Sequence, residues 1–109
     1  MTGTPLPGRA VRGSRSGRPI MALLDLLGRR WALRILWELR EEPVPTFRDL
    51  QRRCDGLSSS VLADRLAELR DAAIVERGGL ALTAQGRELL AALGPLQEWS
   101  HRWEPEKSR

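Results

Sequence analysis

The sequence predicts a mostly α-helical domain with one small β-hairpin, arranged as a winged helix-turn-helix. Two short amphipathic segments, residues 46–54 and 58–71, are separated only by "CDGLS", and this is the spacing of a helix-turn-helix motif. After the second segment, "IVERGGLAL" alternates around Gly78-Gly79, which is typical of a two-residue β-hairpin. A hairpin placed directly after the second helix would be the wing.

Residues 1–18 are expected to form a disordered basic tail. They are rich in Gly, Pro, Ser and Thr and offer almost nothing to bury. Their only charged side chains are Arg9, Arg12, Arg15 and Arg18. The other residues hold 14 basic and 14 acidic side chains, so the net charge of +4 comes from this tail. The pI near 10.9 is compatible with a polyanionic partner and equally with a solubilising tail.

Order is expected to begin near Pro19, because proline is favoured at the first position of a helix. The first helix should end at Gly28, and its apolar residues follow the i, i+3, i+4, i+7 pattern: Ile20, Leu23, Leu24 and Leu27. A second helix within "RRWALRILWELREE" should end before Pro43, and it has one apolar face: Ala32, Ile35, Leu36 and Leu39.

The two helices of the motif each begin at a capping residue. Thr46 opens the first helix, and Asp49 gives the start "TFRD" the spacing of a capping box. The buried stripe of this helix should be Phe47, Leu50 and Cys54. Ser58 is a good N-cap for the second helix, whose buried face should be Leu62, Leu66 and Leu69.

The last helix is expected to start at the capping residue Thr83 and to be kinked or interrupted at Pro95. It carries a long apolar stripe: Leu89, Ala92, Leu93, Leu96, Trp99 and Trp103. One small core cannot easily cover this stripe, which favours a dimer interface enriched in aromatic residues. The folded domain should therefore span residues 19–103 and include a dimerisation helix, with residues 104–109 as a flexible C-terminus.

The start of the second motif helix is the candidate reader of DNA. When successive residues are placed 100° apart, Ser60 and Asp64 point away from the leucine face. Ser59 and Ala63 lie on one flank and Arg65 on the other. Small hydroxyls can pair with donors or acceptors on base edges, and a carboxylate can accept from a cytosine amino group. A plain solvated face is the alternative interpretation.

Arginines on neighbouring elements are expected to contact phosphates. Some lie on the first motif helix, and others, Arg29, Arg30 and Arg34, lie around the start of the helix before it. The expected DNA-binding residues are Thr46, Arg48, Arg52, Arg53, Ser58, Ser59, Ser60, Ala63, Asp64, Arg65 and Arg77.

No pattern in the sequence points to catalysis, a metal site or a cofactor. His101 stands between polar neighbours, and Cys54 has no CxxC spacing. A single cysteine fits a reducing cytoplasm, and no apolar run approaches the roughly 18 residues of a membrane-spanning helix. We therefore expect a cytoplasmic protein that is not an enzyme and uses no cofactor. No feature identifies a small-molecule effector.

Taken in order, four stretches resemble the HxlR-type (MarR-like) winged-helix transcriptional regulators of bacteria. These are "LLDLLGRRWALRILWEL", "TFRDLQRR", "LSSSVLADRLAELRDAAIVER" and "LTAQGRELL" followed by a Trp, so that the similarity runs from about Pro19 to Trp103. The resemblance implies a homodimer that binds operator DNA and pairs mainly through its terminal helices. Arg18-Pro19 stands where redox-sensing members carry Cys-Pro, which argues against thiol sensing. Ala73 stands where a glycine commonly precedes the wing strand.

We interpret the chain as a sequence-specific, homodimeric DNA-binding transcriptional regulator, a repressor rather than an activator. The residues expected at the dimer interface are Ile20, Leu23, Leu27, Leu93, Leu96, Trp99 and Trp103. The alternative is a winged-helix module for protein–protein interaction that has lost DNA binding. The short wing and the acidic end of the reader helix, with Glu68 and Asp71, would be signs of such a module.

Overall fold

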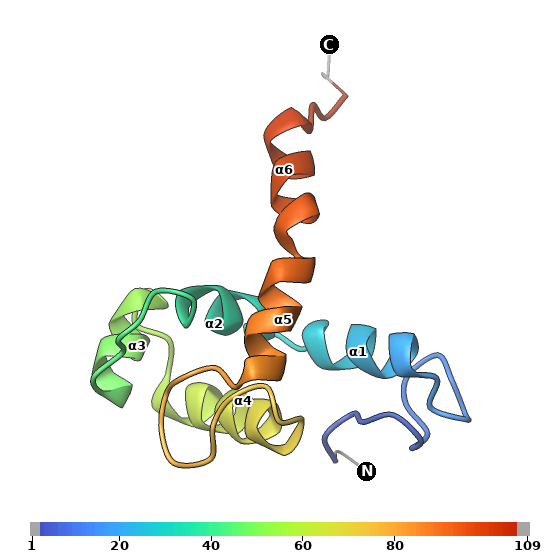
Figure 1. Ribbon diagram of the computed structural model, residues 1–109, viewed down its shortest axis with the longest axis horizontal. Coiled ribbons are helices and arrows are strands. Elements are labelled where there is room, and N and C mark those ends of the chain that lie inside the picture. The colour runs from blue at the N-terminus through green and yellow to red at the C-terminus, as the bar shows by residue number, and fades with distance from the viewer. Residues whose placement is uncertain (1–2, 107–109) are drawn as a thin grey trace.

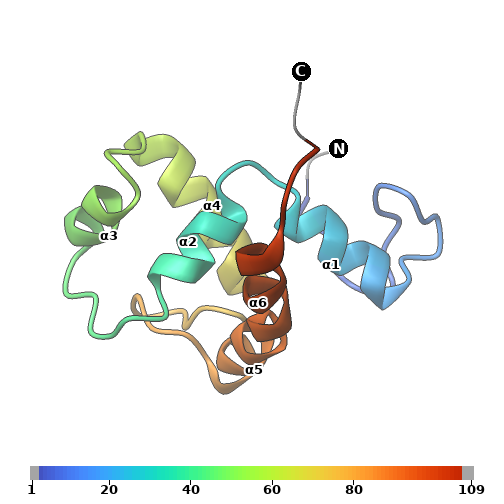
Figure 2. The ribbon, with the colours of Figure 1, turned by 90° about the horizontal axis from the view of Figure 1, so that it is seen from above.

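The computed structural model describes residues 3–106 and is almost entirely helical in this range (Figure 1). Its helices, in chain order, are α1 (Pro19–Leu27), α2 (Ala32–Glu38), α3 (Phe47–Arg53), α4 (Ser59–Asp71), α5 (Ala84–Ala92) and α6 (Gly94–Arg102). Helices α1 to α5 form a compact body, with α3 at one edge and α1 at the opposite edge (Figure 2). Helix α6 continues the direction of α5 and projects out of this body (Figure 1). None of the described helices is long and apolar enough to cross a membrane.

The core lies around α2, which packs against α1, α3 and α4. Its buried side chains come from every helix except α5 and α6 and from the segments beside α4: Leu26, Leu27, Ile35, Leu36, Leu39, Leu50, Cys54, Leu57, Leu62, Leu66, Leu69, Ile74, Val75 and Leu82. The predicted leucine face of the reader helix is therefore confirmed. So is the predicted apolar face of α2, because Ala32, Ile35, Leu36 and Leu39 are all buried.

Helix boundaries agree with the capping signals in the sequence. Helix α1 begins at Pro19 and its C-cap is Gly28, as predicted. Helix α2 is shorter than its apolar pattern and begins only at Ala32, because Trp31 adopts a left-handed backbone with φ 75°. The last helical segment is interrupted at Leu93, next to the predicted position Pro95, and is thus two helices rather than one.

The prediction that Phe47 belongs to the buried stripe of α3 is wrong. Leu50 and Cys54 are fully buried, whereas Phe47 is 37% exposed. The reason is the length of α3, whose seven residues span about 10 Å. Its first turn lies at the edge of the molecule (Figure 2), and Leu57 from the following turn fills the core instead.

The predicted hairpin is reduced to a single antiparallel bridge between Val75 and Leu82. Neither Gly78 nor Gly79 has a positive φ, so the two-residue turn expected from them does not form. The connection is a wider loop whose shape depends on Arg70 of α4. The Arg70 guanidinium donates to the carbonyl oxygens of Glu76 at 3.1 Å and Gly79 at 2.8 Å.

The N-terminal segment also differs from the disordered tail expected from its composition. Residues 3–18 form successive turns, closed by a hydrogen bond from Gly8 N to Gly17 O at 2.9 Å and by reciprocal bonds between Val11 and Ser14. Backbone N–H groups of the segment donate to other residues of the segment and to Asp25 of α1, and the Thr4 hydroxyl donates to Asp71 of α4, which composition alone does not reveal. Residues 1–2 lie outside the described residues. At the other end, 104–106 are exposed and non-helical, and 107–109 lie outside the described residues.

Candidate nucleic-acid interface

The turn between α3 and α4 is fixed by its backbone and by one side chain. Asp55 and Gly56 both have positive φ, at 59° and 77°. This conformation lets Gly56 N donate to Gln51 O at 2.9 Å. The Gln51 side chain then donates to Leu57 O at 2.7 Å. The relative orientation of the two motif helices is therefore set by contacts within residues 51–57.

Both predicted N-caps of the motif are confirmed. The Thr46 hydroxyl accepts from Asp49 N at 3.1 Å and donates to the Asp49 carboxylate at 2.8 Å. This hydrogen bond, helped by the positive charge of Arg52, lowers the pKa of the Asp49 carboxyl. The Ser58 hydroxyl accepts from Val61 N at 3.4 Å at the start of α4.

The first turns of α4 present a small, polar and exposed surface. Its members are Ser58, Ser59, Ser60, Ala63 and Asp64. Ser59 Oγ accepts a hydrogen bond from Gln51 at 3.3 Å. Ser60 and Asp64 have no hydrogen-bonding partner among residues 3–106, so their polar atoms are free to pair with another molecule.

Arg65 does not share this surface, contrary to the prediction. Its side chain is only 19% exposed, and Nε lies 3.3 Å from Glu68. Glu68 in turn accepts a hydrogen bond from Arg29 at 2.6 Å. Glu68 thus pairs with two arginines, and Arg65 belongs to a structural ion-pair cluster on the side of α4 that faces the α1–α2 connection.

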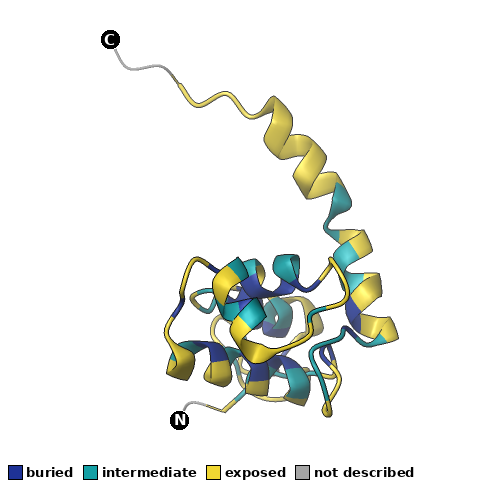
Figure 3. Ribbon diagram, turned by 90° about the vertical axis from the view of Figure 1, so that its left-hand side faces the viewer, coloured by how far each residue is buried: buried dark blue, intermediate teal, exposed yellow. Residues whose placement is uncertain are grey.

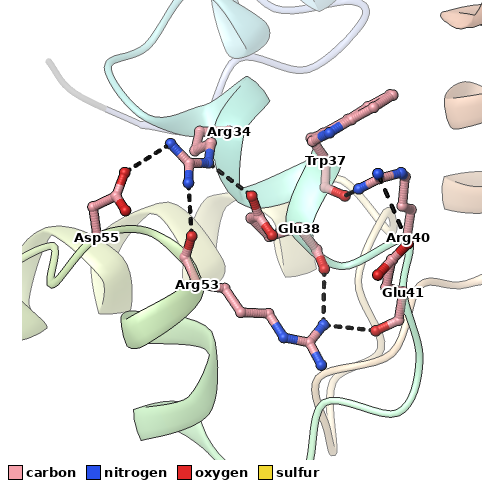
Figure 4. Close-up of polar contacts among 7 residues, drawn as sticks. All are labelled: Arg34, Trp37, Glu38, Arg40, Glu41, Arg53 and Asp55. Atoms are coloured by element: carbon pink, nitrogen blue, oxygen red, sulfur yellow. Dashed lines mark hydrogen bonds and ion pairs between the residues drawn. The ribbon is translucent and has the colours of Figure 1, made fainter.

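Arg53 is likewise engaged within the protein. Its guanidinium donates to the carbonyl oxygens of Glu38, Glu41 and Pro43 at 3.2, 2.6 and 3.0 Å. Figure 4 shows two of these bonds, which hold the loop after α2 against α3. We therefore withdraw Arg53 from the expected phosphate contacts.

Arg34 has a structural role of the same kind. It donates to Glu38 at 2.9 Å, Asp55 at 3.2 Å and the Arg53 carbonyl oxygen at 2.7 Å (Figure 4). The hydrogen bond to Glu38 raises the pKa of the Arg34 guanidinium, against the opposing effect of burial. No signal in the sequence indicates this role for Arg34. For Arg70 there is a weak signal, because basic residues in the last turn of a helix often donate hydrogen bonds to nearby carbonyl oxygens.

The remaining arginines of the predicted set are exposed. Arg48 has no ion-pair or hydrogen-bonding partner among residues 3–106, and Arg52 pairs with Asp49 on the same helix. Arg77 at the wing loop is 76% exposed and lies 3.7 Å from Asp71. Arg30 is also exposed, whereas Arg29 is held by Glu68. Of the arginines in the predicted DNA-binding set, three are therefore exposed to solvent, as the serines of α4 are: Arg48, Arg52 and Arg77.

A second exposed surface is apolar and lies on α6 and α1. Trp99 and Trp103 are 50% and 61% exposed, and their rings stack with centroids 5.6 Å apart. Leu96 and Ile20 are also exposed, and α6 contributes no buried residue (Figure 3). Leu27, predicted at the dimer interface, is instead a buried member of the core.

A groove of about 370 Å³ runs between α2 and the junction of α5 with α6. Its lining is almost entirely apolar and includes Leu33, Trp37, Leu93 and Leu96. The Arg40 guanidinium covers the Trp37 ring at 4.0 Å from its centroid. The groove therefore extends the apolar surface of α6 onto the body of the protein.

Cys54 is fully buried, as predicted, and burial raises the pKa of its thiol. Such a thiol is a poor nucleophile at neutral pH. Within residues 3–106, no cluster of His, Cys, Asp or Glu is arranged to hold a metal ion.

Comparison with known proteins identifies the family of the chain. Residues 26–108 match the family described as HxlR-like helix-turn-helix. The HTH-type transcriptional regulator MJ0925 of Methanocaldococcus jannaschii is 29% identical over 93 residues, covering 80% of this chain and 87% of that protein. The HTH-type transcriptional regulator YvaP of Bacillus subtilis is 28% identical over 89 residues, covering 73% and 82%. No solved structure shows significant similarity to the chain.

Proposed function

The chain belongs to the HxlR-like helix-turn-helix family and is a DNA-binding transcriptional regulator rather than an enzyme, and we propose that it represses transcription as a homodimer on operator DNA. This membership confirms the resemblance deduced from the sequence. The proposal assigns one surface to reading the DNA and another to pairing of the two copies. It also places the protein in the cytoplasm.

The reading of DNA is assigned to the first turns of α4. Ser60 and Asp64 are exposed, have no partner within the described chain, and stand on a helix whose start is capped by Ser58. In helix-turn-helix proteins the N-terminal residues of this helix contact base edges in the major groove. This unpartnered polar surface is the single observation that carries the proposal. Arg48 and Arg52 on α3, and Arg77 on the wing loop near the other end of α4, would bind phosphates.

The pairing of two copies is assigned to α6, α1 and the adjoining groove. A projecting helix with two stacked, half-exposed tryptophans and no buried residue leaves a large apolar area in water. Interface cores are enriched in such aromatic side chains. A second copy is the partner that removes this area from water by a two-fold arrangement, which also places two α4 helices on one duplex.

Repression is proposed because two copies joined through α6 would present two α4 helices to one operator. Occupation of a promoter by such a protein excludes other proteins from the same DNA. Placing the regulated promoter upstream of a reporter tests this. The reporter should be less active when the protein is present, and an increase would identify an activator.

DNA binding itself is tested by fluorescence anisotropy with labelled duplexes of genomic DNA at several salt concentrations. We expect binding of at least one duplex to be much tighter than that of a scrambled duplex and to weaken steeply with salt. Arg48→Gln and Arg52→Gln should weaken all duplexes alike. Failure to retain any duplex at low salt, with a folded dimer in solution, would favour the alternative module for protein–protein interaction.

A further inference from the structure

The N-terminal residues 3–18, here called the arm, contact the C-terminal end of α4, the α1–α2 connection and α1. Thr4 Oγ1 donates to the Asp71 carboxylate at 2.9 Å, and the Gly3 carbonyl oxygen accepts from Arg29 at 3.1 Å. Arg12 N donates to Asp25 of α1 at 3.1 Å. Asp71 faces away from the leucine face of α4, as Ser60 and Asp64 do. The arm is therefore anchored on the same side of α4 that presents the reader residues.

The arm has a defined fold of its own. The Ser14 hydroxyl accepts from the backbone N–H groups of Gly17 and Arg18, each at 3.1 Å. Gly17 is buried with φ +72°, and a Cβ at this position would lie 2.0 Å from the Arg9 carbonyl oxygen. Only glycine fits this close approach. The shape of the arm thus depends on one residue that carries no charge.

The charge of the arm is uncompensated. Its four arginines, Arg9, Arg12, Arg15 and Arg18, are exposed, and none forms an ion pair within residues 3–106. The last two turns of α4 carry Asp64, Glu68 and Asp71. Arg29 and Arg65 pair with Glu68, and Arg77 lies near Asp71, so the charges at this end of α4 are largely paired. Arg9 and Arg12 of the arm line one hollow together with these three acids and add positive charge there.

The length of α4 sets where these charges fall on DNA. Asp71 follows Ser60 by eleven residues, which is about 16 Å along a helix. A helix-turn-helix reader contacts base edges with its N-terminal residues. When the first turns of α4 do so, the arm contacts the opposite end of the helix, away from the bases that are read. Figure 1 shows the arm beside the C-terminal end of α4, at the same lower edge of the molecule.

We propose that the arm is a second, ordered DNA-binding element, which binds the phosphates that flank the major groove occupied by α4. This proposal rests on the proposed function, since it concerns the same duplex. The arm adds binding affinity that does not depend on the base sequence. It also extends the contacted duplex outward from each half-site.

The test uses anisotropy titrations of the full chain with one specific duplex over a range of salt concentrations. Replacing the four arginines by glutamine should reduce the slope of log Kobs against log salt by up to about 3.6 per protomer, at about 0.9 for each phosphate. Replacing them by lysine keeps the charge and should preserve most of the slope. Hydroxyl-radical footprints of the glutamine variant should be shorter at their outer ends.

A second variant separates an ordered arm from a flexible polycation. Gly17→Ala leaves the charge unchanged but its methyl group collides with the Arg9 backbone, so affinity should fall severalfold. Ser16→Ala is the matched control, because Ser16 is an exposed arm residue whose only side-chain hydrogen bond within residues 3–106 is one of 3.4 Å with Ser14. Circular dichroism should show the helical content of all variants unchanged, since the arm lies outside the core.

Three results would overturn the proposal. Equal affinity and slope for the parent and the glutamine variant would mean that the arm does not contact DNA. Tighter binding by the glutamine variant or by Gly17→Ala would make the arm an autoinhibitory element. Unchanged binding by Gly17→Ala alone would reject an ordered arm. If the parent binds no duplex, the proposed function fails with it, whereas these three results leave DNA binding by the parent intact.

Discussion

Arg34 of α2 donates a hydrogen bond to Asp55 in the turn between the motif helices, with Nη1 and Oδ2 3.2 Å apart. The same guanidinium reaches the Arg53 carbonyl oxygen at the end of α3. Arg34 also lines, together with Trp37, the apolar groove that adjoins α6. One side chain therefore connects the turn that orients the reader helix with the surface proposed for pairing.

Arg34→Gln should destabilise the protein more than the equivalent change at an exposed arginine. It removes three hydrogen bonds and leaves the Arg53 carbonyl oxygen without this donor. Arg48→Gln is the control, because Arg48 has no such partners among the described residues. Urea unfolding followed by tryptophan fluorescence should show a lower midpoint for Arg34→Gln alone. Equal midpoints for the two variants would contradict the structural role.

Ala73→Gly should stabilise the protein. Ala73 has φ 59° and follows α4 in a Schellman arrangement, in which Ile74 N donates to Leu69 O and Ala73 N to Arg70 O, each at 2.9 Å. A left-handed conformation costs an L-residue about 1–2 kcal/mol, while glycine loses about 0.5–1 kcal/mol in entropy. The free energy of unfolding should therefore rise by up to about 1 kcal/mol. Ala72→Gly, at φ −82°, should lower it. A higher free energy of unfolding for Ala72→Gly and a lower one for Ala73→Gly would contradict the left-handed conformation assigned to Ala73.

Asp49 should contribute to stability only above mildly acidic pH. Its folded pKa is lowered below the ordinary value of 3.8, chiefly by the hydrogen bond from Thr46. A carboxyl with a depressed folded pKa stabilises the protein fully above its unfolded pKa and loses this effect as the pH falls through the folded value. Asp49→Asn should therefore lower the urea midpoint at pH 6, and the difference from the parent should shrink as the pH falls below the ordinary value of 3.8. A difference that persists unchanged at pH 2.5 would mean that the carboxylate charge is not involved.

Loss of the tryptophan stack should dissociate the dimer. Trp99→Ala combined with Trp103→Ala removes two stacked, half-exposed rings at the end of α6, a helix that contributes no residue to the core. Sedimentation equilibrium should show a folded monomer, and truncation before Gly94 should do the same. Phe47→Ala, which removes an exposed ring on α3 instead, should leave the oligomeric state unchanged. A double variant that sediments as the parent dimer would reject α6 as the interface.

Local signals in the sequence were sufficient to predict most of the fold. Pro19, Thr46, Ser58 and Thr83 mark helix starts because a capping residue acts on its own first turn. The leucine face of α4 follows from periodicity alone. These features depend on residues within about one turn of each other, and the structure agrees with all of them.

The errors arise where a residue's partner is distant in sequence. Arg53 looks like a free surface charge, but its guanidinium donates to carbonyl oxygens 10, 12 and 15 residues away. Arg65 pairs with Glu68, and this ion-pair cluster is completed by Arg29, which is 39 residues from Glu68. The arm looks disordered because its anchor, Asp71, lies 67 residues from Thr4. Contacts of this range are decided by tertiary packing, which neither composition nor periodicity reports.

A binding selection on randomised duplexes with the parent, Ser58→Ala, Ser60→Ala and Asp64→Ala tests the assignment of base reading to α4 most directly. Ser58→Ala should lower stability by about 0.5–2 kcal/mol and weaken all sequences alike, as expected for a lost N-cap. Ser60→Ala and Asp64→Ala should keep their stability but change discrimination by about 1–3 kcal/mol at one position in each half-site. The two half-sites should be about 34–36 Å, or a multiple, apart. Identical base preferences for the parent, Ser60→Ala and Asp64→Ala would contradict this account.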